Sequence, residues 1–252
     1  MIDSHTHPLA HRGGEYTPER LRPFVEEAVA KGLQGLAFTD HEWYKDDIDA
    51  GTVEQLRQEY PGVKILLGIE IDYEPGREEE IRRILAAKPY DYAIGSVHDL
   101  GGWPFDHPDY RSEYRKWDVN RLYERYFATL AQAVESGLFQ LVGHLDLIKI
   151  FGYFYQGDVR SLVRPVLEKI KSQGMAVELN TNGLYKPVRE VYPSREILAE
   201  CLALDIPVVL SSDAHAAWEV GRDFGLALRV LKGVGYRQIS WIEGKKIFSR
   251  DL

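Results

Sequence analysis

Short apolar runs alternate along the chain with longer stretches in which apolar residues recur every three or four positions. The first pattern is typical of buried strands and the second of amphipathic helices. Strands are therefore expected at about 2–6, 35–41, 63–73, 91–98, 139–146, 175–183 and 207–215. Helices are expected at about 18–32, 53–60, 77–87, 119–137, 159–172, after Ser194, and at 218–232, with a short extra strand near 238–241. The pattern predicts seven strand-then-helix units.

Local signals support several of these boundaries. Thr17 followed by Pro18 is an N-cap with proline at the first helical position, and Ser194 can cap the helix that follows it. The largest irregular segment is 99–118, which is rich in aromatic residues and proline. We expect this insertion to cover part of the site, with Tyr114 and Trp117 suited to stack on the organic part of a substrate.

Alternating strands and helices predict an α/β fold with a parallel sheet and helices outside it. Each predicted strand ends in His, Asp, Glu or a polar cluster. In a closed barrel these ends converge on one mouth, whereas a doubly wound open sheet would spread them along a line. The barrel is the preferred interpretation, as a single domain over residues 1–252.

Composition and charge narrow the class of protein. The chain is 44% hydrophobic and 28% charged, as in ordinary globular proteins, and its net charge of −8 argues against non-specific nucleic-acid binding. The one cysteine, Cys201, excludes an intrachain disulfide and is expected to be buried. The sequence shows no signal peptide and no apolar run long enough for a membrane span, so a cytoplasmic protein is expected. Oligomeric state is not visible in the sequence.

Three histidines arrive within the first eleven residues. Residues two apart on a strand share a face, so His5 and His7 can reach one ion, and His11 can hold a second. A tag remnant or a solvated loop is the competing interpretation. Strand ends elsewhere repeat the placement, which gives nine candidate ligands: His5, His7, His11, His41, Glu70, His98, His144, Asp213 and His215.

Nine imidazole and carboxylate groups exceed what one ion can use, so a multinuclear site for Zn, Mn or Fe is predicted. Glu70, the only glutamate among the candidates, is placed to bridge two ions. Asp40, Asp146 and Asp3 are expected to orient ligand histidines or to take part in proton transfer.

The motifs DSHTH, TDH, GIE, SVH, GHLD and SSDAH occur in this order and resemble the polymerase-and-histidinol-phosphatase (PHP) family. The segment ELNTNGLYKP and the following YPS resemble its histidinol-phosphate phosphatase branch. The resemblance implies a distorted (β/α)7 TIM-like barrel with three divalent ions. It implies that the first ion binds His5, His7, Glu70 and Asp213, the second His11, His41 and His215, and the third Glu70, His98 and His144.

The expected reaction is hydrolysis of a small phosphate monoester, L-histidinol phosphate in histidine biosynthesis, by a metal-bridging hydroxide. Glu70, Asp213 and His215 are the expected catalytic groups, with Asp146 as a candidate acid for the leaving group. Arg160 and Arg195 are candidates for the phosphate, Lys186 and Asn180 for further contacts, although both arginines also fit solvated helix starts.

Three other interpretations remain open. The chain could be a PHP phosphoesterase for a nucleotide or phosphotyrosine, a nuclease for single-stranded nucleic acid, or a metal-binding barrel without catalysis. The acidic charge disfavours the nuclease, and the complete ligand set disfavours the scaffold.

Overall fold

The computed structural model describes residues 1–10 and 13–252. The predicted ligand His11 lies outside the described residues.

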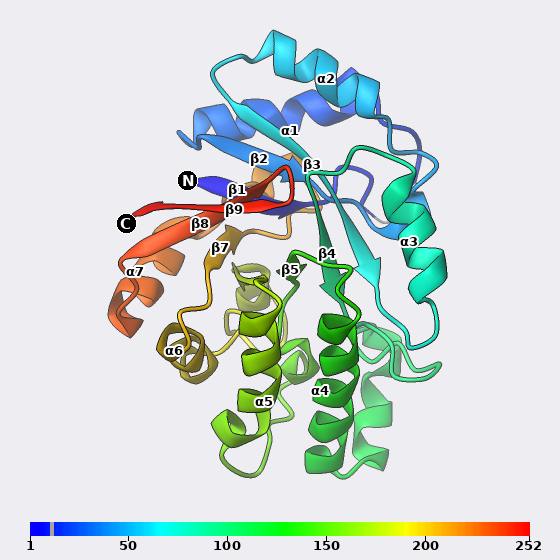
Figure 1. Ribbon diagram of the computed structural model, residues 1–252, viewed down its shortest axis with the longest axis vertical. Helices are drawn as coiled ribbons and strands as arrows, with labels where there is room; N and C mark the ends of the chain where they lie inside the picture. Colours follow the sequence, from blue (N-terminus) through cyan, green and yellow to red (C-terminus); the bar gives the residue numbers. More distant parts are fainter. Residues whose placement is uncertain (11–12) are drawn as a thin grey trace.

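Seven parallel strands follow one another in chain order around a barrel, and each is followed by a helix on the outside (Figure 1). The predicted α/β barrel of seven strand-then-helix units is therefore confirmed. The strands are β1 (Ile2–Thr6), β2 (Gly35–Phe38), β3 (Lys64–Asp72), β4 (Tyr92–Ser96), β5 (Leu141–Val142), β6 (Ala176–Asn180) and β7 (Val208–Ser211). The helices are α1 (Pro18–Ala30), α2 (Ala50–Glu59), α3 (Glu78–Ala86), α4 (Val119–Glu135), α5 (Val159–Ser172), α6 (Arg195–Ala203) and α7 (Phe224–Val234).

The barrel interior changes from apolar to polar along the strands. Its lower part is one buried cluster to which β1 to β7 and a further strand, β8 (Gln238–Glu243), all contribute: Ile2, Ala37, Leu66, Tyr92, Ile94, Leu141, Ala176, Val209 and Ile242. Residues two or four further along a strand share the same face. Glu70 on β3, Glu178 on β6 and Asp213 after β7 therefore enter the same interior above this cluster. A larger apolar cluster fills the space between the strands and the helices.

The barrel closes between β1 and β7 through short contacts. Thr6 pairs with Ala214, and the His7 backbone N–H donates to the Ala214 carbonyl at 2.7 Å. The buried Asp3 carboxylate accepts hydrogen bonds from the backbone N–H groups of Ser212 (2.9 Å) and Gly221 (2.7 Å). Asp3 therefore joins the two strands, and its contact with a ligand histidine is a hydrogen bond from the backbone N–H of His5 at 3.5 Å and not from an imidazole ring, where orientation of the ring was expected.

The chain ends in a hairpin beyond the seven units. β8 (Gln238–Glu243) pairs parallel to β7 and antiparallel to β9 (Lys246–Asp251). The predicted extra strand is β8, and β9 was not predicted because its residues are largely exposed and lack an apolar run.

Some helix boundaries differ from the prediction for local reasons. α2 begins at Ala50 because the Asp49 carboxylate accepts from the N–H of Thr52 at 2.8 Å. Ser194 caps α6 as predicted, whereas the Thr17 side chain makes no capping bond. α7 begins at Phe224, after a short 3₁₀ helix at Ala217–Glu219. Cys201 is fully buried, as expected.

The aromatic insertion packs against the barrel. It contains a 3₁₀ helix, Pro108–Lys116, and its Tyr114 is buried. The Tyr114 hydroxyl donates to the Ile148 carbonyl at 3.1 Å, and its ring stacks on Tyr153. Trp117 stacks on Trp103 at 5.7 Å between ring centroids. These contacts stabilise the insertion itself. The expectation that Tyr114 stacks on a substrate is wrong, because its hydroxyl and its ring already contact other residues of the protein. The expectation for Trp117 stays a prediction.

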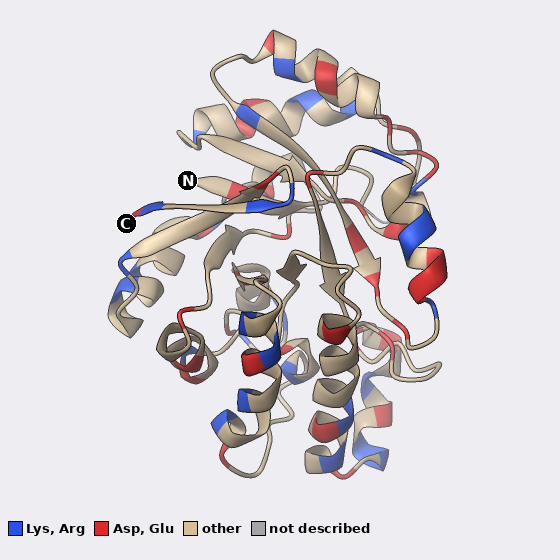
Figure 2. Cartoon of the chain, viewed as in Figure 1, with Lys and Arg blue, Asp and Glu red and all other residues tan. Residues whose placement is uncertain are grey.

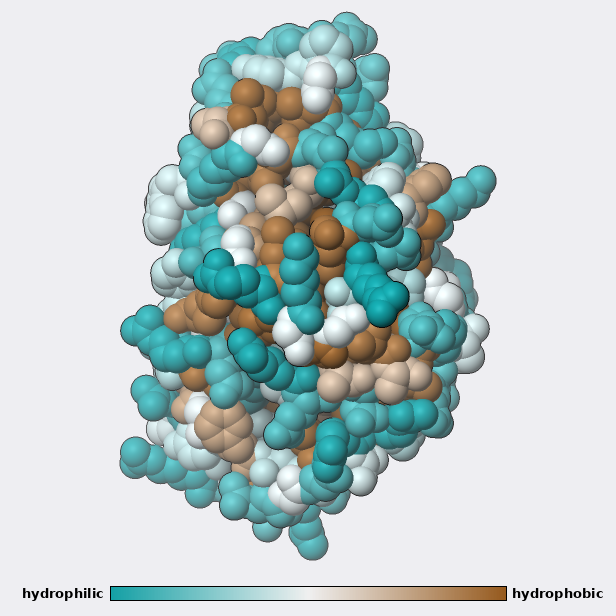
Figure 3. Space-filling model, turned by 90° about the vertical axis from the view of Figure 1, so that its left-hand side faces the viewer, coloured by the Kyte–Doolittle hydropathy of each residue, from teal (hydrophilic) through white to brown (hydrophobic). Residues whose placement is uncertain are grey.

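Charged side chains lie mainly on the outer helices and loops (Figure 2). On the face that carries α7 and the terminal hairpin, hydrophobic residues are interrupted by hydrophilic ones (Figure 3). Among the described residues, no helix combines the length and apolarity that crossing a membrane requires.

Prediction for the β2–β3 pair: Gly35→Ala lowers the free energy of unfolding by roughly 1–3 kcal/mol, because an added Cβ overpacks the strand pair. A Cβ at Gly35 would lie 2.2 Å from the backbone oxygen of Lys64, its partner in β3. Gly62→Ala, where a Cβ meets nothing within 4 Å, is the matched control. Urea unfolding of both variants measures the effect, and equal stabilities would contradict it.

Candidate metal centre

The predicted ligand residues that the structure describes lie together at the C-terminal mouth of the barrel. Six of them line one cavity of about 480 Å³: His41, Glu70, His98, His144, Asp213 and His215. His5 and His7 lie directly beneath and are fully buried. Polar groups from strands far apart in sequence therefore share one small volume.

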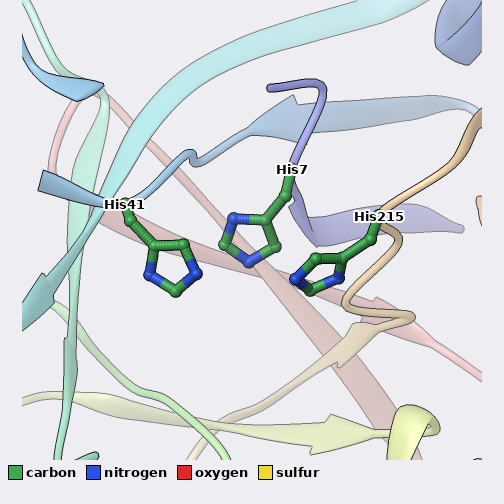
Figure 4. Close-up of side chains that lie close together, drawn as sticks. All are labelled: His7, His41 and His215. Atoms are coloured by element: carbon green, nitrogen blue, oxygen red, sulfur yellow. The ribbon is translucent and has the colours of Figure 1, made fainter. Parts of the chain in front are cut away.

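Three groups of these side chains have their ligand atoms within 4.8 Å of one another. They are His5, His7 and Glu70; Glu70, His98 and His144; and His7, His41 and His215. The rings of the last group point toward one another from the segments that follow β1, β2 and β7 (Figure 4). His7 lies 4.4 Å from His41 and 4.5 Å from His215, between ring centroids. His7 therefore belongs to two groups, which spacing alone did not show.

Glu70 lies between the groups, with one carboxylate oxygen facing each side. Oε2 is 3.3 Å from His5 Nε2 and 3.0 Å from His41 Nδ1. Oε1 is 3.1 Å from His144 Nε2 and accepts a hydrogen bond from Ser96 Oγ at 2.6 Å. This arrangement is the one that a bridging carboxylate requires.

The distances between ligand atoms fit divalent metal ions. Two nitrogen ligands about 2.0–2.1 Å from a tetrahedral ion lie about 3.3 Å from each other. His5 Nε2 and His7 Nε2 are 2.9 Å apart, and His98 Nε2 and His144 Nε2 are 3.2 Å apart. Imidazole nitrogens and carboxylate oxygens are also the donors that such ions prefer. The mouth therefore holds His/Glu clusters that can bind metal.

Burial keeps part of this set in the metal-binding form. It lowers the pKa of His7 to about 4, with His215 adding to the effect, and it lowers the pKa of His41 well below the usual range. Both rings are therefore neutral at pH 7, as a metal ligand must be. Burial opposes ionisation of Glu70, but His5 and His41 hold its pKa well below the usual range.

Two carboxylates for which the sequence predicted no role accept hydrogen bonds from ligand histidines, through the ring nitrogen opposite the metal-binding one. Glu178 Oε2 accepts from His5 Nδ1 at 2.9 Å, and Asp72 accepts from His98 Nδ1. Burial opposes protonation of His5, yet Glu178 and Glu70 raise the pKa of His5 well above its usual value. A carboxylate on the far ring nitrogen fixes the tautomer that presents Nε2 to a metal. Asp72 is the last residue of β3, two residues after Glu70, and Glu178 lies in β6, two residues before Asn180; this period of two was the available signal.

Asp213 adopts a left-handed backbone with φ of 52°, which directs its carboxylate into the mouth. Its Oδ1 is 3.3 Å from His7 Nε2. Its Oδ2 accepts from the amides of Asn180 (3.3 Å) and Asn182 (3.1 Å). Asn180 also donates to Glu178 and does not line the cavity, so its amide positions other side chains where contact with a substrate was expected.

Two of the expected orienting aspartates have other partners. Asp40 accepts from the Tyr16 hydroxyl at 2.8 Å and from the Leu9 N–H at 3.0 Å, while its nearest approach to His7 Nδ1 is 3.9 Å. Asp146 bonds Lys149 Nζ (2.9 Å) and the Ser194 N–H (2.9 Å). Asp146 lines a second cavity, of about 520 Å³, and not the one at the metal ligands. Its expected role as acid for the leaving group is therefore not supported.

The predicted phosphate-binding cations are not brought together. Arg160 is exposed and pairs with Asp158 at 2.9 Å, as a solvated helix-start arginine does. Arg195 is exposed and lines the second cavity beside Asp146. Lys186 is the one Lys or Arg among the described residues that lines the cavity at the metal ligands. Neither arginine lines the cavity at the metal ligands, and their contact with a phosphate stays a prediction.

Comparisons with known proteins agree with this geometry. Residues 3–182 match the model of the PHP domain. The chain is 38% identical to the "Probable histidinol-phosphatase" of Deinococcus radiodurans, covering 96% of each chain, and 30% identical to the "Histidinol-phosphatase" of Bacillus subtilis, covering 87% of this chain and 95% of the other.

A solved structure shows the same fold. The histidinol phosphate phosphatase of Lactococcus lactis, crystallised with zinc, L-histidinol and phosphate, superposes with a TM-score of 0.77 at 23% identity and covers 98% of both chains. With the family model matching most of its length, and with relatives at 30% identity or more, this chain belongs to the PHP family.

Proposed function

We propose that this protein is a metal-dependent phosphatase that hydrolyses L-histidinol phosphate to L-histidinol and phosphate. The observation that carries the proposal is Glu70, whose two oxygens face two different histidine groups at the mouth of a PHP barrel. The substrate follows from the relatives, one of them 38% identical over nearly the whole chain and named as a histidinol-phosphatase. The Lactococcus structure of the same fold holds zinc, L-histidinol and phosphate.

We propose three divalent ions, of which zinc is supported by that neighbour. His5, His7, Glu70 and Asp213 would hold one, Glu70, His98 and His144 another, and His41 and His215 with His7 or the undescribed His11 a third. When bound, such ions lower the pKa of water toward neutrality and neutralise the charge of a phosphoryl group.

The chain's own side chains would then position the reactants. Lys186 lies on the cavity wall and would donate to a phosphate oxygen as a point charge. Glu178 and Asp72 hold His5 and His98 in their ligand tautomers. Asn180 and Asn182 fix one oxygen of Asp213, so that its other oxygen faces His7.

The alternatives differ in what the cavity would accept. A volume of about 480 Å³ suits a small phosphomonoester, whereas a nucleic-acid strand would require a basic track for its backbone. The cavity wall carries five carboxylates and one lysine among the described residues. A small substrate is therefore favoured, with a nucleotide or phosphotyrosine as the competing small substrates.

Prediction for activity: the metal-loaded protein releases phosphate from L-histidinol phosphate in preference to nucleotides, phosphotyrosine and single-stranded DNA. Glu70→Gln lowers kcat/KM by at least about 100-fold, because a bridging ligand is lost. Glu79→Gln, with a side chain 85% exposed on α3, is the control and keeps wild-type activity. Equal weak rates on every substrate would contradict the assigned substrate, and an active Glu70→Gln enzyme would contradict the site.

Prediction for metal content: protein loaded with divalent metal and dialysed retains about three ions per chain, measured by inductively coupled plasma mass spectrometry. The three side-chain groups are the physical reason. Stepwise chelation should lower activity together with ion content. One tightly held ion that alone sustains full activity would contradict the trinuclear arrangement.

Prediction for Glu178: Glu178→Gln weakens metal binding by roughly 10- to 100-fold, because the amide cannot match a carboxylate as acceptor for the His5 ring. The variant should regain activity at higher metal concentration, which a purely structural defect would not allow. Glu79→Gln is again the matched control. Titration calorimetry with Zn²⁺ measures the affinity, and an unchanged dissociation constant would show that Glu178 does not tune His5.

A further inference from the structure

The carboxylates on the cavity wall differ in their hydrogen-bond and ion-pair partners. Glu70, Asp72 and Asp213 each contact a histidine of the metal-binding groups. Asp99 accepts a hydrogen bond from the Gly102 N–H at 2.5 Å, within its own turn. Asp106 is the exception, because among the described residues no hydrogen bond from another residue and no ion pair engages its carboxylate.

Asp106 is nevertheless held firmly in place. The preceding residue, Phe105, is fully buried and meets Tyr126 edge-on at 5.6 Å. The Phe105 N–H donates to the carbonyl of His98 at 3.2 Å, and the His107 N–H donates to the carbonyl of Pro104 at 3.1 Å. The backbone on both sides of Asp106 is therefore held in place, next to the His98 backbone, and Asp106 is not on a free loop.

An unpaired carboxylate in this position is costly unless a cation completes it. Asp106 is partly buried on the cavity wall, where water solvates a carboxylate less well than in bulk solvent. A charged hydrogen-bond donor arriving with the ligand would remove this cost. Lys186 is the corresponding cation on the wall and suits an anionic group. The cavity thus offers separate partners for a negative and a positive group on one molecule.

We propose that Asp106 binds the ammonium group of the substrate and so selects phosphate esters that carry an amine near the ester oxygen. This inference rests on the proposed function and deepens it. In L-histidinol phosphate the ammonium lies on the carbon next to the ester carbon, so it stays close to the phosphate. Asp106 lies on the wall of the same cavity as the metal ligands, so it can contact an ammonium group that stays close to the phosphate. Asp106 acts on specificity and is not a metal ligand.

The test compares two substrates with three proteins. The substrates are L-histidinol phosphate and its desamino analogue, imidazolylpropyl phosphate. The proteins are wild type, Asp106→Asn, and Asp109→Asn, a control in the same insertion whose side chain is 87% exposed. Asp106→Asn is expected to lower kcat/KM for the amine substrate by roughly 10- to 100-fold, the value of a hydrogen bond to a charged group. Turnover of the analogue stays within about threefold of wild type, and Asp109→Asn changes neither.

Further measurements separate the possible failures. Metal content and thermal unfolding of Asp106→Asn should equal those of wild type, and loss of an ion would show that Asp106 supports the metal centre. Equal losses on both substrates, or no loss, would overturn the proposal. If wild type hydrolyses neither ester, the proposed function fails. Calorimetric binding of L-histidinol against imidazolylpropanol then still decides whether Asp106 prefers the amine.

Discussion

The rest of the structure depends on one buried carboxylate, that of Glu70. Glu70 is almost fully excluded from water, and an isolated charge there would cost far more than the fold can supply. Its compensation comes from histidines delivered by the ends of four other strands, at 3.0–3.7 Å. In the metal-free chain, protonated rings such as His5 provide that charge, so metal ions and protons compete for the same place. The register of the barrel has to serve this carboxylate, because shifting one strand by one residue would turn its histidine to the opposite face.

The barrel can bury polar side chains at its mouth because apolar residues fill the rest of its interior. Below the mouth, small and large apolar residues from eight strands fill the barrel. Around the ligands, polar groups are tied to one another: Glu178 takes the His5 ring, the His144 N–H and the Asn180 amide. A buried polar network stabilises a single arrangement only when its members are satisfied. Residues such as Glu178, which hydrogen-bond to the ligand side chains, therefore determine how precisely the ligands are placed.

Local patterns predicted the elements and most of the ligands, but not their grouping. His5, His7 and Glu70 could be assigned because strand parity and chain position are visible in sequence. That His7 also faces His41 and His215 depends on barrel curvature, which no local pattern encodes. The orientations of Arg160 and Arg195 could not be predicted, because a helix start near the mouth does not determine where a long side chain points. Asp106 gave no signal, since its position depends on how an irregular insertion folds back onto His98. β9 was missed because an exposed edge strand carries no apolar run.

The negative charge of the cavity wall affects how an anionic substrate binds. The chain carries a net charge of −8, and the cavity wall holds Glu70, Asp72, Asp99, Asp106 and Asp213 against Lys186 among the described residues. Without metal, this wall repels a phosphate ester, because like charges in a confined, poorly hydrated space interact strongly. Bound divalent ions would reverse the sign of the potential at the ligands and leave the potential beside the insertion negative. The metal-loaded cavity would then be positive at the ligands and negative beside Asp99 and Asp106. Such a cavity discriminates by the charge pattern of a molecule as well as by its phosphate, which a uniformly basic pocket cannot do.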